Sequence, residues 1–327
     1  MKKNVLGLGN ALLDILIPAN DELLQQFNLP KGSMQLVDES KRNEVLEVTQ
    51  NLKRTLISGG SAANTIHGLA CLGVPSGFIG KIGADEYGKI FSNDLMKAGI
   101  EPLLLVGDDV NGTAVTFITD DSERTFATYL GAAVEQTPEE LNNKDFARYS
   151  MLHIEGYLVF NHALVEKAVR IARDNGMKIS LDCASYNVVD ANRDFLLGII
   201  ERYVDIVFAN EEEARSLTGK EPEEALKVLS LLCDIAVVKI GAQGSLIASG
   251  NESVKVGVAP VKRVLDTTGA GDLYASGFLW AYINGHSLDK CGKAGAITAG
   301  RVIEEYGARI AANRWTELIE EIKVAVN

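Results

Sequence analysis

Cysteine is scarce in this chain, and the few cysteines are far apart. The 327 residues include four, Cys71, Cys183, Cys233 and Cys291, and no two of them form a CxxC pair. This spacing indicates neither a zinc knuckle nor a redox pair. We expect four reduced, buried thiols, as is usual for proteins of the cytoplasm.

Basic clusters and long apolar runs are missing as well. The net charge is −12 without any cluster of Lys and Arg, so nucleic acid is not an expected partner, because neutralising phosphates needs a basic stripe. No stretch approaches the roughly 20 apolar residues of a membrane span. Asn10 and Asp14 interrupt the apolar stretch after Lys3, which argues against a signal peptide. The sequence therefore predicts a cytoplasmic protein without membrane contact.

Two familiar nucleotide-binding motifs are also absent. The segment from Gly7 to Leu12 reads GLGNAL and lacks the third glycine of GxGxxG, which disfavours a dinucleotide-dependent oxidoreductase. No GxxxxGK(S/T) motif exists, so a P-loop ATPase is not supported either.

What the sequence does contain is an alternation of short apolar strands and helical patterns. Several strands are almost entirely apolar, as expected when helices cover both faces of a sheet, and the alternation favours a doubly wound, mostly parallel α/β sheet. We expect one domain over residues 1–327. The expected strands are Val5–Leu8, Ser76–Ile82, Met151–Ile154, Lys178–Asp182, Ile206–Phe208 and Ile235–Ile240. The expected helices are Ala62–Leu72, Tyr87–Ala98, Leu164–Asn175, Glu211–Leu217, Pro222–Leu232, Ala270–Ile283, Leu288–Tyr306 and Thr316–Val326.

A second, smaller sheet is expected near the N-terminal third. Thr113–Thr119 and Arg124–Tyr129 form a strand pair around a polar turn at 120–122. With Ile15–Pro18 and Ser33–Val37 they make a lid of about residues 15–37 and 112–130. A lid at the mouth of an α/β domain keeps water away from a reacting group.

The motif with the clearest chemistry is DTTGAGD, from Asp266 to Asp272, which precedes an apolar helical pattern. Small residues before a helix leave backbone N–H groups free, and the helix dipole adds positive potential, so Gly269, Ala270 and Gly271 are suited to hold an anion. Asp272 then lies in the first turn, where it could accept a hydroxyl proton. A bare GAGD is equally typical of a glycine loop with a helix N-terminal charge. The longer motif favours catalysis.

These residues carry a family resemblance. The segment Asp266–Asp272 resembles the C-terminal signature of the PfkB/ribokinase family of carbohydrate and nucleoside kinases, and Gly59–Asn64 with Gly73 resembles its N-terminal glycine signature. The resemblance covers nearly the whole chain. It implies a ribokinase-like fold, MgATP as phosphoryl donor, Asp272 as base and Gly269, Ala270 and Gly271 as the anion hole.

The same resemblance implies a donor side of the site. Asn210 and Glu213 match a motif that organises Mg²⁺, partly through water, whereas an acidic helix start is the plain alternative. Lys239, Gly241 and Thr268 match residues near the nucleotide, and Gly244 matches a turn in the same loop. Asp266, Thr268 and Gly307 match loosely the position of a monovalent cation in related kinases, which makes K⁺ a further candidate ligand.

The acceptor side is expected around Asp14 and Asn64. A carboxylate that interrupts an apolar strand needs a partner, and the two vicinal hydroxyls of a furanose would supply one; a solvent-facing strand end is the alternative. Asn64, after Gly59 and Gly60, can donate and accept toward the same sugar. Arg124 matches a family arginine near the transferred phosphate, or is an exposed hairpin charge.

Two segments are similar to adenosine kinases in particular. They are the opening from Gly9 to Ile15, which includes Asn10, and the stretch KGSMQLVDE from Lys31 to Glu39. Leu12 and Leu36 match apolar residues that hold the base, and Tyr157 could stack on it; ordinary packing is the alternative for all three. Thr268 and Ala62–Ala63 depart from the subgroup's pattern.

We therefore expect a kinase that phosphorylates the 5′-hydroxyl of adenosine or a similar ribonucleoside. The alternatives are a sugar kinase acting on ribose, fructose or a related sugar acid, and a non-catalytic nucleoside- or sugar-binding regulator on the same fold. The sequence leaves a monomer or a homodimer open, since unpaired lid strands invite pairing.

Overall fold

The main body of the protein is a nine-stranded sheet. The computed structural model describes residues 3–119, 121 and 123–327; Asp120 and Ser122 of the expected turn lie outside these. Neighbours from β6 to β12 are parallel, and β13 and β14 add an antiparallel edge. In spatial order the strands are β14 (Glu252–Val256), β13 (Ser245–Ser249), β12 (Ile235–Lys239), β11 (Ile206–Asn210), β10 (Lys178–Asp182), β9 (Met151–Glu155), β1 (Val5–Leu8), β5 (Ser76–Ile82) and β6 (Ile100–Val106).

Helices cover both faces of this sheet because its strands are apolar on both sides. Along β11, Ile206 and Phe208 point into one core and Val207 and Ala209 into the other. The first core is covered by α3 (Ser61–Cys71), α4 (Glu86–Lys97), α10 (Ala270–Ile283), α11 (Leu288–Val302) and α12 (Trp315–Val326). The second is covered by α5 (Asn143–Phe146), α6 (His162–Asp174), α7 (Tyr186–Tyr203), α8 (Glu211–Thr218) and α9 (Pro222–Leu229). The predicted mostly parallel α/β sheet with helices on both faces is confirmed.

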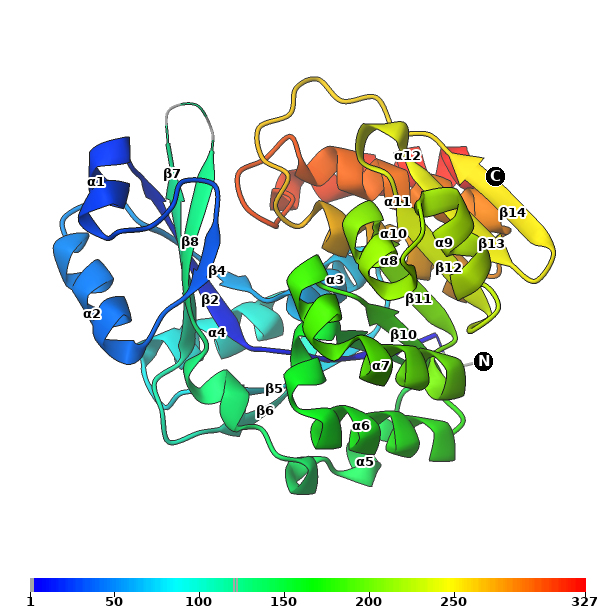
Figure 1. The fold of residues 1–327 in the computed structure, drawn as a ribbon, viewed down its shortest axis with the longest axis horizontal. Coiled ribbons are helices and arrows are strands. Elements are labelled where there is room, and N and C mark those ends of the chain that lie inside the picture. The colour runs from blue at the N-terminus through cyan, green and yellow to red at the C-terminus, as the bar shows by residue number, and fades with distance from the viewer. Residues whose placement is uncertain (1–2, 120, 122) are drawn as a thin grey trace.

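A separate five-stranded sheet stands beside the main body (Figure 1). Ile15 and Val115 face α1 and α2 in a small core of their own, whereas the alternate residues Asp14 and Ala114 line a cleft. In spatial order its strands are β3 (Met34–Leu36), β8 (Arg124–Tyr129), β7 (Gly112–Ile118), β2 (Leu12–Pro18) and β4 (Thr55–Gly59), and its helices are α1 (Asp21–Gln26) and α2 (Glu39–Val48).

Most predicted elements occur within a few residues of the expected bounds, and Ala270–Ile283 occurs as predicted. The helix predicted over Leu288–Tyr306 is wrong at its end, because α11 stops at Val302 and the chain turns so that Gly307 can approach Asp266. The sequence pattern did not predict α1, α2, α5, α7, β4, β6, β13 and β14.

Two of the crossings between the sheets touch each other. The chain passes from β1 to β2 through Gly9, Asn10 and Ala11, and from β4 to α3 through Gly60. Gly60 has φ +93°, and a Cβ atom there would collide with the carbonyl oxygen of Asn10, so only glycine lets the two crossings touch.

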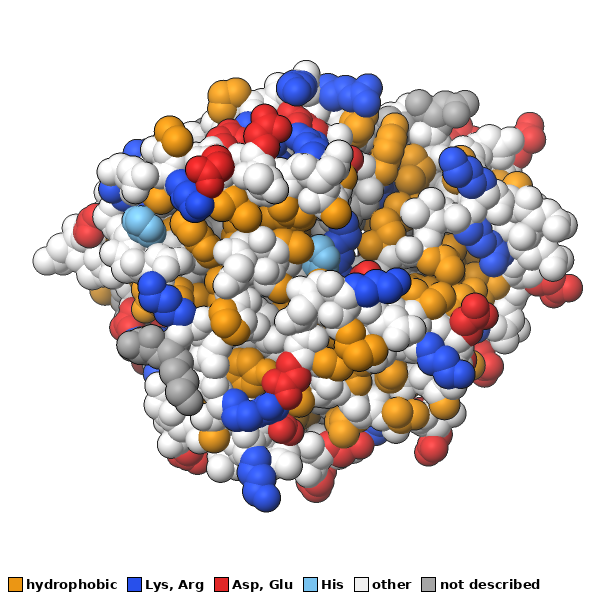
Figure 2. Space-filling view, turned by 180° about the vertical axis from the view of Figure 1, so that it is seen from behind, with side chains coloured by type: hydrophobic (Ala, Val, Ile, Leu, Met, Phe, Trp, Pro, Cys, Tyr) orange, Lys and Arg blue, Asp and Glu red, His pale blue; other side chains and the backbone are white. Residues whose placement is uncertain are grey.

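The surface mixes charges of both signs. On the face shown in Figure 2, acidic and basic side chains are interspersed among apolar ones. Among the described residues, every helix is too short or too polar to span a bilayer.

Candidate active site

A cleft of about 1850 Å³ lies between the lid sheet and the carboxyl ends of the main-sheet strands. Single-ligand pockets usually measure about 300–1,000 Å³, so this cleft has room for two small molecules side by side. Most of the site residues predicted from the sequence line it. The exceptions are Gly59, Arg124, Asp266 and Gly307, which are not among the lining residues.

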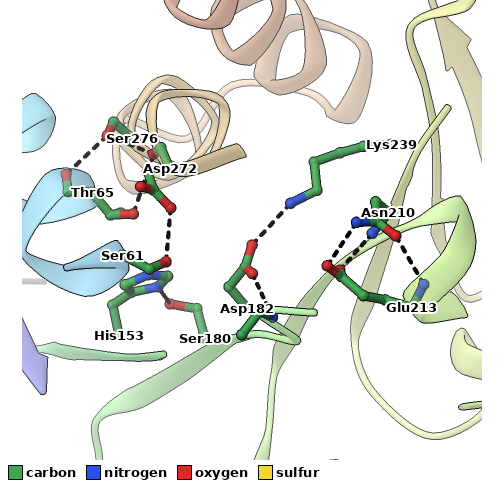
Figure 3. A network of polar contacts seen from close by, with 11 residues as sticks. Ser61, Thr65, His153, Ser180, Asp182, Asn210, Glu213, Lys239, Asp272 and Ser276 are labelled. Atoms are coloured by element: carbon green, nitrogen blue, oxygen red, sulfur yellow. Dashed lines mark hydrogen bonds and ion pairs between the residues drawn. The ribbon is translucent and has the colours of Figure 1, made fainter. Parts of the chain in front are cut away.

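Asp272 lies in the first turn of α10, inside the cleft, with both carboxylate oxygens held. Figure 3 shows its contacts with Ser61 and Thr65. The hydroxyl of Ser61 donates to Oδ1 at 2.7 Å, and Nδ2 of Asn64 donates to Oδ2 at 2.9 Å. Thr65 and Ser276 donate to its main-chain carbonyl at 3.2 and 2.9 Å. These contacts join α3 and α10, so the carboxylate cannot swing away from the cleft.

The protonation of Asp272 is set mainly by burial. Burial disfavours the charged form and raises the pKa of Asp272 to about 6, although the hydrogen bond from Asn64 works in the opposite direction. At neutral pH the group is therefore mostly ionised. A carboxylate with a pKa just below the working pH can both take a proton and release it, which is what a general base requires.

Small residues beside Asp272 leave room for an anion. Gly269 has φ +74°, and a Cβ atom on it would come 2.5 Å from the Cβ of Ala308. Within the described residues, the N–H groups of Gly269 and Gly271 have no backbone acceptor, whereas that of Ala270 donates to the carbonyl of Thr267 at 3.2 Å. Gly269 and Gly271 are thus the better placed of the three predicted donors.

Lys239 brings a positive charge to the same point. A Cβ atom on Gly271 would lie 3.0 Å from Nζ of Lys239, so the missing side chain makes space for this ammonium group. Nζ also pairs with Oδ2 of Asp182 at 2.9 Å. Burial alone would lower the pKa of Lys239, but the carboxylates of Asp182 and Glu213 outweigh it and raise the pKa. Lys239 is therefore a permanent cation.

The loop after Lys239 reverses the chain. Gly241 has φ +53° and lines the cleft. Gly244 has φ +95°, and a Cβ atom on it would collide with the carbonyl oxygen of Val256. Gly244 is required by the turn, as the sequence suggested, and also lines the cleft.

Asn210 and Glu213 form a capping box at the start of α8. Glu213 accepts from the backbone N–H of Asn210 at 2.8 Å and from its Nδ2 at 2.7 Å, while Asn210 Oδ1 accepts from the N–H of Glu213 at 2.8 Å. Burial raises the pKa of Glu213 to about 7. Since both oxygens already accept hydrogen bonds, Glu213 suits contact with an ion through water better than direct ligation.

Mg²⁺ fits this arrangement as a partner of bound phosphates. The described residues contain no group of three or more His, Cys, Asp or Glu side chains placed to hold a metal. Mg²⁺ typically keeps several waters and binds through one or two carboxylates plus phosphates. Asp182 and Glu213 line the cleft and could orient such waters.

Asp266 is hydrogen-bonded to the other two residues predicted to hold a monovalent cation, Thr268 and Gly307. Its Oδ1 accepts from the N–H of Thr268 at 2.9 Å and its Oδ2 from that of Gly307 at 2.5 Å. Arg124, on the lid strand β8, also forms an ion pair with Asp266. The negative charge is thus compensated by a guanidinium, and Arg124 is a buried link between lid and motif, not an exposed hairpin charge.

Asp14 faces the cleft from β2 with its carboxylate available. Among the described residues, no hydrogen bond or ion pair to its side chain is formed. A Cβ atom on Gly59, on the neighbouring strand, would collide with this carboxylate, so glycine gives it room. Burial raises the pKa of Asp14 to about 7, while the charge of Arg309 lowers it. Two neighbouring hydroxyls of a ligand would satisfy the group.

A buried glutamate, Glu155, links the residues around Asn10 to the start of α3. Glu155, at the end of β9, accepts from Nδ2 and N–H of Asn10 at 2.7 and 3.0 Å and from the N–H of Ala62 at 2.9 Å. Burial raises the pKa of Glu155 to about 7. Asn64 is 5% exposed, and its Oδ1 has no partner within the described part of the chain. That acceptor is free for a ligand hydroxyl.

Apolar side chains line the cleft near Asn10. Leu12 lies on β2, Tyr157 in the 3₁₀ helix η3 (Gly156–Phe160), and Leu36 on the edge strand β3. Leu36 is 61% exposed, so it lies at the mouth of the cleft and not in the protein core. All three line the cleft, and their contact with a nucleobase stays a prediction.

Four residues of the site were not predicted, namely Ser61, Glu155, Asp182 and Arg309. Arg309 is half-buried and donates from Nη2 to the carbonyl and hydroxyl oxygens of Ser58 at 2.9 and 2.8 Å. A signal existed for two of the four. Glu155 and Asp182 end apolar parallel strands at matching positions, and ligands of open α/β sheets bind at the carboxyl ends of such strands.

Comparison with known proteins gives a consistent result. Residues 25–315 match the family described as pfkB family carbohydrate kinase. A probable sugar kinase from Rhizobium etli CFN 42 is 37% identical, with a TM-score of 0.89 and coverage of 99% of this chain and 98% of that one. The adenosine kinase from Sinorhizobium meliloti is 35% identical, with a TM-score of 0.88 and coverage of 99% and 100%. A nucleoside kinase from Methanocaldococcus jannaschii is 29% identical over 269 residues, which are 81% of this chain and 85% of that protein.

Proposed function

Since the chain belongs to the pfkB family of carbohydrate kinases, we propose that it transfers the γ-phosphoryl group of ATP to the 5′-hydroxyl of adenosine or a similar ribonucleoside. Membership of this family makes it a phosphotransferase with an alcohol group as acceptor, and the expected resemblance is confirmed. The nature of the acceptor is the part that we propose.

The observation that supports the proposal most is the position of Asp272. Its ionised carboxylate lies in the same cleft as the unpartnered Asp14, next to the free N–H groups of Gly269 and Gly271. One cleft therefore contains a proton acceptor, a carboxylate that can bind hydroxyls, and an anion site. A protein that only bound a nucleoside or sugar would need the hydroxyl-binding carboxylate but neither of the other two groups.

The chemistry follows from these three features. Asp14 and Asn64 would hold the ribose hydroxyls, which directs the 5′-hydroxyl toward Asp272. Asp272 takes the hydroxyl proton as the oxygen bonds to phosphorus, and the bond to the leaving ADP breaks. The N–H groups of Gly269 and Gly271 stabilise the charge on the transferring group. The lid excludes water, which would otherwise compete as acceptor.

The donor is expected beside α8 and the Lys239 loop. Bound MgATP supplies the phosphoryl group together with a cation that offsets the phosphate charge. Lys239 would contact phosphate, Gly241 and Thr268 would lie against the nucleotide, and Asn210 and Glu213 would orient metal-bound water. K⁺ near Asp266 stays a prediction, and Arg124 already supplies a positive charge there.

The preference for a nucleoside over a free sugar depends on the wall of Leu12, Leu36 and Tyr157. Free sugars have hydroxyls on most sides and would leave these side chains against polar groups. A ribonucleoside offers a diol to Asp14 and a flat apolar base to this wall. The similarity to a probable sugar kinase keeps sugar phosphorylation as the alternative to test.

A substrate panel tests the proposal directly. ADP release is measured with the purified full chain, MgATP and one of adenosine, inosine, ribose or fructose. We expect kcat/KM for adenosine to exceed that for ribose by at least about a hundredfold, since base contacts of a few kcal/mol correspond to such ratios. Equal or better turnover of a free sugar would reject the nucleoside as substrate while leaving the kinase chemistry intact.

A further inference from the structure

Gln136 carries a buried side-chain amide without a hydrogen-bond partner among the described residues. Its side chain is 2% exposed and lines the cleft. Neither Oε1 nor Nε2 makes a hydrogen bond within the residues that the structure describes. Buried polar groups are nearly always paired, so an unpaired donor and acceptor on one side chain need an explanation.

The backbone around Gln136 is fixed. The carbonyl of Gln136 accepts from Nδ2 of Asn161 at 3.1 Å. Glu135 just before it accepts from the N–H groups of Asp108 and Asp109 at 2.8 and 3.1 Å, and its carbonyl accepts from Nζ of Lys81 at 3.1 Å. An unpaired side-chain amide on a fixed backbone is typical of ligand-binding groups, because little conformational entropy is then lost when a ligand binds.

The location of Gln136 points to the acceptor, not to ATP. It lies in the crossing from the lid strand β8 to β9, directly after the 3₁₀ helix η1 (Gly131–Glu135). This crossing starts beside Leu12, because a Cβ atom on Gly112 would touch both the Leu12 side chain at 2.5 Å and the Leu130 carbonyl at 2.5 Å. Val134, two residues before Gln136, also lines the cleft. The amide therefore belongs to the apolar end where Leu12 and Leu36 lie.

The chemistry of the missing partner follows from the amide. A Gln side chain presents one acceptor and one donor in a plane, and it pairs with a group that offers a donor next to an acceptor. Surrounded by apolar walls, it suits a flat molecule with one polar edge. The amino group and adjacent ring nitrogen of a 6-aminopurine form such an edge, and Gln is a known bidentate partner of adenine.

Building on the proposed function, we propose that Gln136 binds the edge of the acceptor's nucleobase through both amide atoms and thereby selects a 6-aminopurine. Leu12, Leu36 and Tyr157 hold the faces of the base, and Gln136 reads its edge. Gln136 is a specificity-determining residue that takes no part in proton transfer.

The test compares two enzymes, each with two substrates. Wild type and Gln136→Leu are assayed with adenosine and with purine riboside, which lacks the 6-amino group. We expect wild type to favour adenosine by about tenfold or more, the size of effect that a bidentate base contact gives. In Gln136→Leu this preference should fall to within about twofold. Gln50→Leu, an exposed glutamine outside the cleft, is the matched control and should keep the wild-type preference.

Thermal unfolding separates binding from a structural role. Without ligand, Gln136→Leu should unfold at the same temperature as wild type or higher, because it loses no internal hydrogen bond. Saturating adenosine should raise that temperature less in Gln136→Leu than in wild type. A lower unfolding temperature of the ligand-free variant, or an unchanged preference for adenosine, would overturn the assignment of Gln136.

Failure of the proposed function gives a different pattern. If wild type phosphorylates a free sugar and no nucleoside, both the proposed function and the nucleobase contact are rejected. If wild type phosphorylates nucleosides and Gln136→Leu loses activity equally on both of them, only the role of Gln136 is rejected.

Discussion

Replacing Asp272 by asparagine removes the proposed base and changes little else. In wild type, Ser61 and Asn64 both donate to the carboxylate. An asparagine can keep its oxygen toward Nδ2 of Asn64 and turn its amide toward Ser61, whose hydroxyl is able to accept as well as donate. Both contacts survive, so the variant should fold and bind substrates.

The magnitude follows from catalysis and from burial. Positioned general bases contribute about 10²–10⁴ in rate, so kcat of Asp272→Asn should fall by at least about a hundredfold. The free energy of unfolding of Asp272→Asn, in contrast, should not fall. Because burial raises the pKa of Asp272 from 3.8 to about 6, this group destabilises the fold progressively as pH rises through that interval. Above pH 7 the neutral asparagine should therefore be at least as stable, by up to about 3 kcal/mol.

The assay is ADP release between pH 5 and 9, together with thermal unfolding at pH 8. Wild-type kcat should rise with pH around 6, and Asp272→Asn should lose that rise. Asp289→Asn is the matched control, since Asp289 is also a first-turn aspartate, on α11 and outside the cleft. A kcat loss below about tenfold in Asp272→Asn would refute the reasoning and leave Asp272 as a helix N-terminal charge.

Three further substitutions address the acceptor, the anion site and the buried ion pair. Asp14→Asn should raise KM for the acceptor by about tenfold to a hundredfold, the value of a charged hydrogen bond, and an unchanged KM in steady-state kinetics would exclude the diol contact. Gly269→Ala should lower the free energy of unfolding by about 1–3 kcal/mol and reduce kcat, whereas Gly250→Ala, at φ +55° in open space, should leave kcat intact. Lys239→Met leaves Asp182 buried and unpaired, so the free energy of unfolding, measured by urea denaturation, should fall by about 3–5 kcal/mol. Adding Asp182→Asn to this variant should restore part of the loss. An unchanged free energy of unfolding would mean that the pair is not buried in solution.

Local chemistry explains which parts of the fold were predictable. The helix Ala270–Ile283 follows from small residues before a long apolar run, and it occurs as predicted. The missed helix α7 has a non-helical residue inside it, Asn192, which interrupts the 3.6-residue period. The edge strand β14 is mostly exposed and polar, so no apolar run marks it. Such elements are specified by neighbours in space, which a single sequence does not reveal.

The same division applies to the site. The motif around Asp272 could be found because its spacing is local and its chemistry needs glycine. Ser61 could not, since its role depends on a contact with a residue 211 positions away. Gln136 likewise follows no recognisable motif, and only its burial without a partner distinguishes it.

The way the chain crosses between the two sheets separates catalysis from specificity. Asp182, Asn210 and Lys239 end strands of the main sheet, and we propose that they face the phosphates of the donor. Asn10, Gly60 and Gln136 lie in crossings between main sheet and lid and line the cleft, and we propose that they face the acceptor. Under this proposal, a substitution at Gln136 reshapes the acceptor pocket without removing a hydrogen bond to Asp272. If the proposed roles hold, kinases of nucleosides and of sugars in one family should differ mainly in these crossings, because the residues at the strand ends serve the donor that they share.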